Sequence, residues 1–176
     1  MPLLAELLDA LRVAVTQAPD AGAYLEEPWR QFVGAAREIG NDAVAEEYDT
    51  LFGGVGKPEV YLFGSHYLSG FLNDKALARL RTDLAALGLA RDEAMPETED
   101  HIAYLCEVMR YLIAGDDVAV SNLTRQREFF ATHLQPWVNE LCDVTAAHPK
   151  ARFYAALAGF TRAFASVEAQ AFDMLE

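Results

Sequence analysis

The sequence is poor in the residues that build cross-linked proteins. Only two of its 176 residues are cysteines, Cys106 and Cys142, and no C-x-x-C pair occurs. Both lie in apolar helical patterns, so we expect buried thiols that do not act as nucleophiles. This usage is typical of the reducing cytoplasm. With 52% apolar residues, the chain can fold as one domain, residues 1–176, without disulfides or metals.

Long apolar runs and positive charge are also scarce. No uncharged apolar run approaches the about 18 residues of a membrane-spanning helix, so we expect no membrane insertion. The N-terminal "MPLLAELLDALRVAV" lacks a basic region, and it predicts an amphipathic helix rather than a signal peptide. The net charge of −13 makes nucleic acid an unfavourable partner and a basic peptide a plausible one. Solubility alone explains the charge equally well.

Motifs for catalysis and metal binding are missing. The sequence contains neither G-x-S-x-G nor H-E-x-x-H. None of the four histidines, His66, His101, His133 and His148, has a Glu three positions earlier, as a helical di-iron site requires. The spacing of zinc ligands is absent too. The sequence therefore predicts no catalytic residue, no metal and no cofactor.

The stretch "GGVGKP", residues 53–58, contains half of a phosphate-binding loop. Gly56 and Lys57 fit the pattern G-x-x-x-x-G-K-[ST], but Leu51 replaces the first glycine and Pro58 replaces the hydroxyl residue. A predicted helix also precedes the loop, where the motif requires a strand. We therefore interpret this stretch as a connection, and a small helical ligand-binding enzyme is a remote alternative.

Apolar residues recur with the helical period along almost the whole chain, which predicts an all-α protein of about eight or nine helices around one core. The expected helices cover about 4–15 (ended by Pro19, Asp20 and Gly22), 28–40, 41–52 with Asn41 as N-cap, 73–88 with Asn73 as cap, 102–115, 116–136, 136–147 and 149 onward. The longest irregular stretch is 53–65. In the last helix Phe153, Leu157, Phe160, Phe164, Val167 and Ala171 form a packing seam.

Two polar clusters stand out from this pattern. Glu97, Glu99 and Asp100 crowd the expected start of a helix, where carboxylates stabilise the helix dipole. That effect does not explain His101, which lies one turn after Glu97 and could pair with it.

The second cluster is Gln126, Phe130, His133 and Trp137, spaced to share one face if the helix continues to Pro136. Such a face suits a partly hydrated groove. From periodicity alone, a core aromatic pair with a hydrogen-bonded histidine is the better explanation.

Three stretches contain these clusters and the glycine loop: "EYDTLFGGVGKPEVYLFGSHYL", "PETEDHIAYLCEVMRYLI" and "REFFATHLQPW". Together they resemble the TorD/DmsD/NarJ family of redox-enzyme maturation chaperones. The family pattern is Tyr-x-x-Leu-Phe, a loop with Pro-Pro-Tyr-x-Ser, Glu-x-Pro-Asp-His, and Phe-x-x-x-His-Leu-x-x-Trp. Order and spacing agree over about residues 41–140, with Tyr61-Leu62 and Glu99 in place of prolines.

The resemblance implies a cytoplasmic, non-enzymatic, all-helical chaperone. It would bind the catalytic subunit of a molybdenum- or tungsten-pterin oxidoreductase, through the twin-arginine signal peptide of that subunit, and delay export until the cofactor is inserted. The alternative is a NarJ-like assembly factor for a subunit that is not exported. The sequence also leaves open whether the protein is a monomer or a domain-swapped homodimer that exchanges segments through the glycine loop. The implied client-binding residues are Phe63, Ser65, Tyr67, Glu97, Asp100, His101, Gln126, Phe130, His133 and Trp137.

Overall fold

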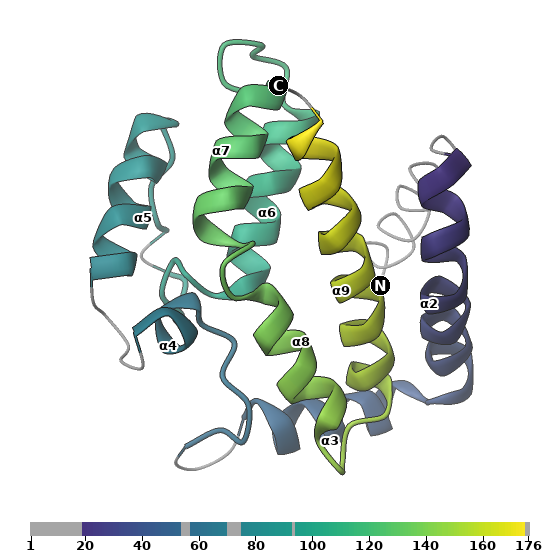
Figure 1. Ribbon diagram of the computed structural model, residues 1–176. Helices are drawn as coiled ribbons and strands as arrows, with labels where there is room; N and C mark the ends of the chain where they lie inside the picture. Colours follow the sequence, from purple (N-terminus) through teal and green to yellow (C-terminus); the bar gives the residue numbers. More distant parts are fainter. Residues whose placement is uncertain (1–18, 54–56, 70–74, 93, 175–176) are drawn as a thin grey trace.

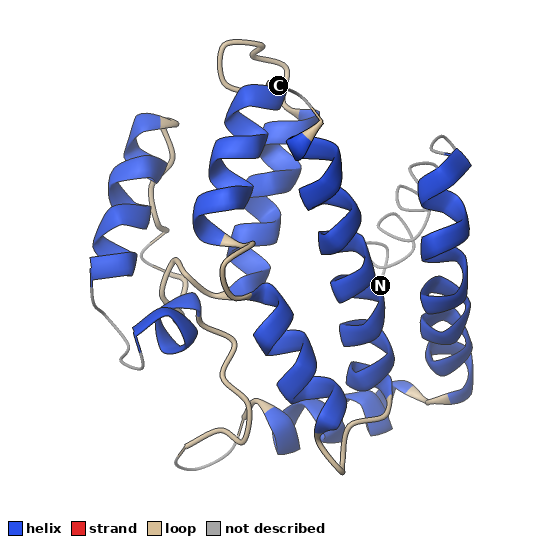
Figure 2. Cartoon of the chain, viewed as in Figure 1, coloured by secondary structure: helices blue, strands red, loops and turns tan. Residues whose placement is uncertain are grey.

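The computed structural model describes residues 19–53, 57–69, 75–92 and 94–174, and all the regular structure in these ranges is helical (Figure 2). The described residues form eight helices, namely α2 (Pro19–Glu38), α3 (Asn41–Leu51), α4 (Gly64–Ser69), α5 (Lys75–Ala86), α6 (Ile102–Ala114), α7 (Leu123–His133), α8 (Val138–Ala147) and α9 (Phe153–Asp173). This confirms the all-α prediction. The expected helix at 4–15 lies outside the described residues, and no helix within them is long and apolar enough to cross a membrane.

The long helix α9 is central to the arrangement (Figure 1). It packs against α2 on one side and α8 on the other. Helices α6 and α7 form a hairpin beside it, whereas α5 stands at the edge of the molecule and α3 runs beneath α8 and α9. The main apolar core includes Leu77, Leu105, Leu112, Phe130 and Trp137, and most of its residues come from helices α5 to α9.

A smaller aromatic core joins α2 to α9. Phe32 and Phe160 stack with ring centroids 6.0 Å apart, and Trp29 lies 5.3 Å from Phe160. The third buried ring of this cluster is Phe153. Phe153 and Phe160 both belong to the packing seam predicted for α9. Apolar burial on both sides therefore fixes α9 as the axis of the fold.

Several helix ends follow local sequence signals. Asn122 caps α7, its side chain accepting a hydrogen bond from the Arg125 N–H at 3.0 Å. Gly88 has a φ of +74°, which favours glycine, and it ends α5 as predicted. The N–H of Leu89 bonds to the carbonyl of Leu84 at 2.9 Å, which completes the usual glycine-terminated helix end. Helix α6 ends before Gly115, also as predicted.

Predicted helix starts were less accurate. Helix α2 begins at Pro19 and contains Pro28, so the expected break at 19–22 and the new start at Pro28 were wrong. Proline is well suited to a first helical position, and burial of Leu25 and Phe32 on one face holds the helix together across Pro28. Asn41 is the first residue of α3 rather than its cap.

Helices α7 and α9 also begin after their predicted starts. Residues 115–122 form a connector instead of the start of a helix at Asp116, because Asp117 bonds locally to the Ala119 N–H and Asn122 supplies the cap. Helix α7 ends at His133, and α9 starts at Phe153 rather than Pro149. The expected loop 53–65 is shortened at its end by α4, which begins at Gly64.

Candidate functional site

Asp100 joins two segments that are far apart in the sequence. Its Oδ2 accepts a hydrogen bond from the backbone N–H of Ser65 at 2.9 Å, and its Oδ1 accepts one from the Thr98 hydroxyl at 2.6 Å. The Gly64 N–H also bonds to the Asp100 carbonyl at 3.0 Å. The side chain is buried, with 4% exposed. Asp100 therefore fixes the first turn of α4, and not that of α6 as the sequence suggested.

His101 extends the same connection. Phe63 and His101 form an isolated antiparallel bridge, and their rings meet edge to face at 5.2 Å. His101 is also the N-cap of α6, since its Nδ1 accepts a hydrogen bond from the Ala103 N–H at 3.2 Å. Burial lowers the pKa of His101 below its usual range, although Glu97 and Asp100 oppose that effect. The neutral ring is therefore the form that caps the helix.

The neighbouring glutamates do not act as first-turn carboxylates. Helix α6 begins at Ile102 with no acidic residue in its first turn, so the predicted dipole role of this cluster was wrong. Glu99 instead binds Arg81 of α5 through two hydrogen bonds of 2.9 and 3.0 Å. Glu97 is exposed, and no ion pair between Glu97 and His101 forms in the described part of the chain.

Trp137 lies beneath α4. Its indole N–H donates to the carbonyl of His133 at 2.6 Å, and its ring stacks on Tyr67 with centroids 5.5 Å apart. A Cβ at Gly64 would lie 3.0 Å from the indole, so only glycine fits there comfortably. Burial raises the pKa of Tyr67 to about 12, and its hydroxyl donates to the Tyr61 carbonyl at 2.8 Å. Trp137 therefore stabilises the floor of this region.

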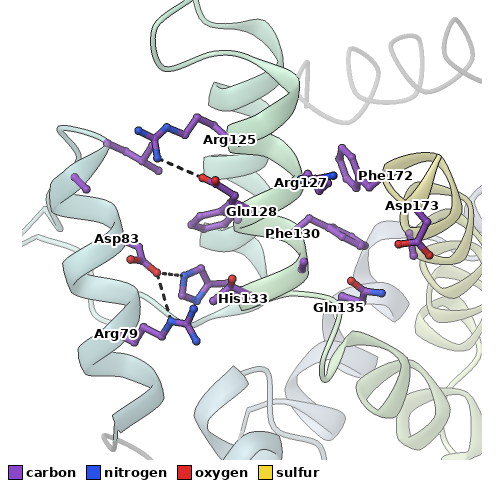
Figure 3. Close-up of a pocket in the computed structure, with 16 residues that line it drawn as sticks. Arg79, Asp83, Arg125, Arg127, Glu128, Phe130, His133, Gln135, Phe172 and Asp173 are labelled. Atoms are coloured by element: carbon purple, nitrogen blue, oxygen red, sulfur yellow. Dashed lines mark hydrogen bonds and ion pairs between the residues drawn. The ribbon is translucent and has the colours of Figure 1, made fainter. Parts of the chain in front are cut away.

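The remaining predicted residues lie on α7, and two of them, Phe130 and His133, line a groove. His133 Nε2 is 2.8 Å from the Asp83 carboxylate of α5 (Figure 3). Burial lowers the pKa of His133, and the hydrogen bond to Asp83 opposes this shift. Phe130 projects to the other side of α7, where its ring lies 5.6 Å from Phe172 (Figure 3). Gln126 donates to the Leu112 carbonyl at 2.9 Å and so ties α7 to α6.

This groove has a volume of about 600 Å³ and is lined by α5, α7 and the end of α9. Charges of both signs line it, and most are paired: Arg125 contacts Glu128 at 3.3 Å, and Arg79 lies 3.9 Å from Asp83. Because Trp137 lies beyond the end of α7 and is 1% exposed, it does not share a wet helical face with Gln126 and Phe130. The four residues therefore do not form one hydrated face, and the buried Phe130 and Trp137 with the hydrogen-bonded His133 agree with the core explanation that periodicity favoured.

Burial divides the ten predicted site residues. Five are buried inside the protein, namely Ser65, Asp100, Phe130, His133 and Trp137. Phe63, Tyr67, His101 and Gln126 are partly buried, and Glu97 is exposed. Among the described residues, the surface near Phe63, Glu97 and His101 offers a partner several of these side chains at once.

Sequence reasoning left two tyrosines out of that surface. The ring of Tyr104 lies 5.5 Å from that of His101. Burial raises the pKa of Tyr48, and the nearby Glu97 and Asp49 carboxylates and Tyr104 raise it further. We call Tyr48, Phe63, Glu97, His101 and Tyr104 the aromatic–acidic surface. The one sequence signal for Tyr104 is its position one helical turn after His101.

The loop that resembles a phosphate-binding motif, residues 53–58, is followed by Glu59, whose side chain anchors the chain at this point. Glu59 contacts His148 at 2.7 Å and Lys150 at 3.0 Å, and hydrogen bonds from these two residues lower the pKa of Glu59. The Val60 N–H bonds to the Leu51 carbonyl at 2.9 Å. In the described residues a helix, α3, precedes the loop, which is the wrong context for a phosphate cradle.

Within the described ranges, neither cysteine has a partner suited to nucleophilic catalysis. Cys142 is buried, and burial raises the pKa of its thiol to about 12. Cys106 is exposed among the described residues, so its predicted burial was wrong. It lies one helical turn before the buried Met109, and partial burial still raises the pKa of its thiol to about 11. The described ranges hold no group of three or more side chains suited to bind a metal ion.

The family model described as nitrate reductase delta subunit matches residues 18–143, more than half of the chain. This chain therefore belongs to the nitrate reductase delta subunit family, the NarJ/TorD chaperones. These are non-catalytic chaperones that bind the catalytic subunit of a molybdoenzyme during its maturation. No curated protein sequence matches the chain significantly.

Proposed function

We propose that this chaperone binds the N-terminal segment of its molybdoenzyme client at the aromatic–acidic surface. The observation that supports this is the pairing of aromatic rings with a free carboxylate. Glu97 is exposed and forms no hydrogen bond or ion pair within the described ranges, and it lies close enough to Tyr48 to raise the pKa of that residue. Aromatic faces and carboxylates are the groups that bind guanidinium cations.

The proposed ligand is a twin-arginine signal peptide, retained until the cofactor is inserted. Such a segment has a basic region followed by an apolar stretch. A protein with a net charge of −13 speeds the encounter with a basic peptide. The family description favours one alternative, a nitrate-reductase-type client whose N-terminal segment is bound in the same way but is not exported.

The test is a binding titration with a fluorescein-labelled peptide of roughly the first 40 residues of the molybdoenzyme catalytic subunit from the same genome. We expect binding that weakens, without disappearing, as salt rises from about 50 to 500 mM. We also expect Glu97→Gln to weaken binding, with Glu38→Gln as the matched control because it removes the same charge from α2. If the two variants lose the same amount of peptide affinity, Glu97 makes no specific contact with the peptide, and the acidic charge serves solubility alone. A peptide with both arginines replaced by glutamine should bind the wild type more weakly than the original peptide does. The same replacement should reduce the affinity of the Glu97→Gln variant by a smaller factor, because that variant has already lost the carboxylate.

A further inference from the structure

A second concave surface runs along the outside of α6. It is a groove of about 330 Å³ between α6 and the connector that follows α5, and we call it the α6 groove. Its lining is mainly apolar and includes Leu84, Leu89, Met95, Val108 and Tyr111. Leu84 is buried, whereas 41% of Met95 is exposed to solvent. The volume lies near the lower end of the about 300–1,000 Å³ of ligand pockets, which suits a few side chains rather than a whole segment.

The α6 groove is continuous with the aromatic–acidic surface. Tyr104 lines the groove and also lies 5.5 Å from the ring of His101. Glu99 lines the groove too, and it is only two residues from Glu97. Because Arg81 already binds Glu99 through two hydrogen bonds, Glu97 is the carboxylate left for a partner at this junction.

The charges give the combined surface a direction. Its acidic end carries Glu97 and, near Tyr48, Asp49. Within the groove, Arg110 pairs with Glu107, and Arg91 donates to the Met95 carbonyl at 2.6 Å. Because Glu97 has no partner within the described residues and the groove is mainly apolar, a ligand with a basic part and an apolar part is favoured with its cations at Glu97.

We propose that the α6 groove binds the apolar stretch that follows the basic residues of the client segment. The inference rests on the proposed function, and it adds where the apolar residues are buried and in which direction the segment runs. Its basic residues lie at Glu97 and Tyr48, and its apolar residues contact Leu89, Met95 and Val108. Burial of apolar side chains would then supply most of the affinity, while the acidic end would set the direction.

Photo-crosslinking tests the direction. A benzoylphenylalanine at position 95 should crosslink to the apolar stretch of the labelled client peptide, and one at position 48 should crosslink to its basic region. Position 144 on α8 serves as the control, since Val144 is similarly exposed and lines neither surface. The reverse order, or crosslinks from both sites to the same residues, would overturn the proposed direction.

Binding measurements test the groove itself. We expect Met95→Glu to weaken binding of the peptide by about tenfold or more. The variant should have much less effect on a peptide whose apolar residues are replaced by serine. Undiminished binding by Met95→Glu would overturn the groove assignment while leaving the proposed function intact. If the wild type binds neither peptide, both proposals fail. If Met95→Glu instead converts a dimer to a monomer in sedimentation, the groove is an interface between copies, and the inference is wrong.

Discussion

The carboxylate of Asp100 holds the backbone N–H of Ser65, 35 residues away in the sequence, at 2.9 Å inside the protein. Through this bond the segment before α6 determines where α4 begins. The bridge between Phe63 and His101 runs beside it. Phe63 and His101 belong to the proposed client surface and Asp100 precedes His101, so residues that resemble a binding motif also maintain the shape of that surface.

Replacing Asp100 should therefore affect stability first. Asp100→Ala leaves the Ser65 N–H buried without a partner, and we expect the free energy of unfolding to fall by about 2–3 kcal/mol. Glu97→Ala is the control, because Glu97 is exposed and its loss should change stability by less than about 0.5 kcal/mol. Urea denaturation of both variants provides the measurement. An Asp100→Ala protein as stable as the wild type would show that water replaces the carboxylate.

Ser65 offers the opposite case. Its hydroxyl is buried and has no hydrogen-bond partner among the described residues. Removing an unpaired buried polar group is neutral or stabilising, so we expect Ser65→Ala to raise the free energy of unfolding by up to about 1 kcal/mol. Thermal unfolding and the peptide titration should be measured on the same sample. If Ser65→Ala is stable but binds the client peptide poorly, the hydroxyl is a contact for the partner.

Glu47 should be a strong contributor to stability outside the site. Its carboxylate on α3 accepts hydrogen bonds from the N–H groups of Arg152, Phe153 and Tyr154 at 2.8–3.1 Å, so it caps α9 from a distance. We expect Glu47→Ala to lower the free energy of unfolding by about 2 kcal/mol. Glu46→Ala removes the exposed neighbouring charge and should have little effect. If both variants lose a similar free energy of unfolding, the effect comes from a change in helix propensity within α3 rather than from the capping of α9.

Two glycines provide a matched pair. A methyl group at Gly64 would lie 3.0 Å from the indole of Trp137, whereas one at Gly159 would meet nothing within 4 Å. Gly64→Ala should therefore destabilise the protein by about 1–3 kcal/mol. Gly159→Ala lies within α9 and should stabilise it by about 0.5–1 kcal/mol. Denaturation midpoints of the two variants should move in opposite directions, and a stabilising Gly64→Ala would mean that Trp137 is free to shift.

The buried histidines predict how stability depends on pH. Burial lowers the pKa values of His101 and His133 in the folded protein, so the unfolded chain binds more protons as pH falls below its histidine pKa of about 6.5. The contribution of the two histidines to the free energy of unfolding is complete above that pH. It is lost as the pH falls through their pKa values in the folded protein. We therefore expect stability to decrease between about pH 7 and 5.5.

The double variant His101→Gln, His133→Gln should reduce this slope, as measured by urea denaturation at several pH values. Glu168 acts with the opposite sign, because burial raises its carboxyl pKa. The quantity to compare is therefore the difference between wild type and variant. Identical slopes would exclude these two histidines as the titrating groups.

Sequence alone determined the helical class and several helix ends. The end of α5 follows from Gly88, and the extent of α6 follows from the spacing of Leu105, Met109 and Leu112 and from Gly115, because these signals act within a few turns. The family resemblance likewise came from local motifs, and the family match confirms it over residues 18–143.

Tertiary structure decided the roles of the polar residues. Asp100 caps α4, Glu47 caps α9 and Trp137 lies beneath Gly64, all through contacts between segments far apart in the chain. Periodicity and capping rules describe neighbours along the sequence, so they assigned Asp100 to the wrong helix. The same limit hid Tyr104 and the α6 groove, because a groove exists only after a connector has folded back against a helix.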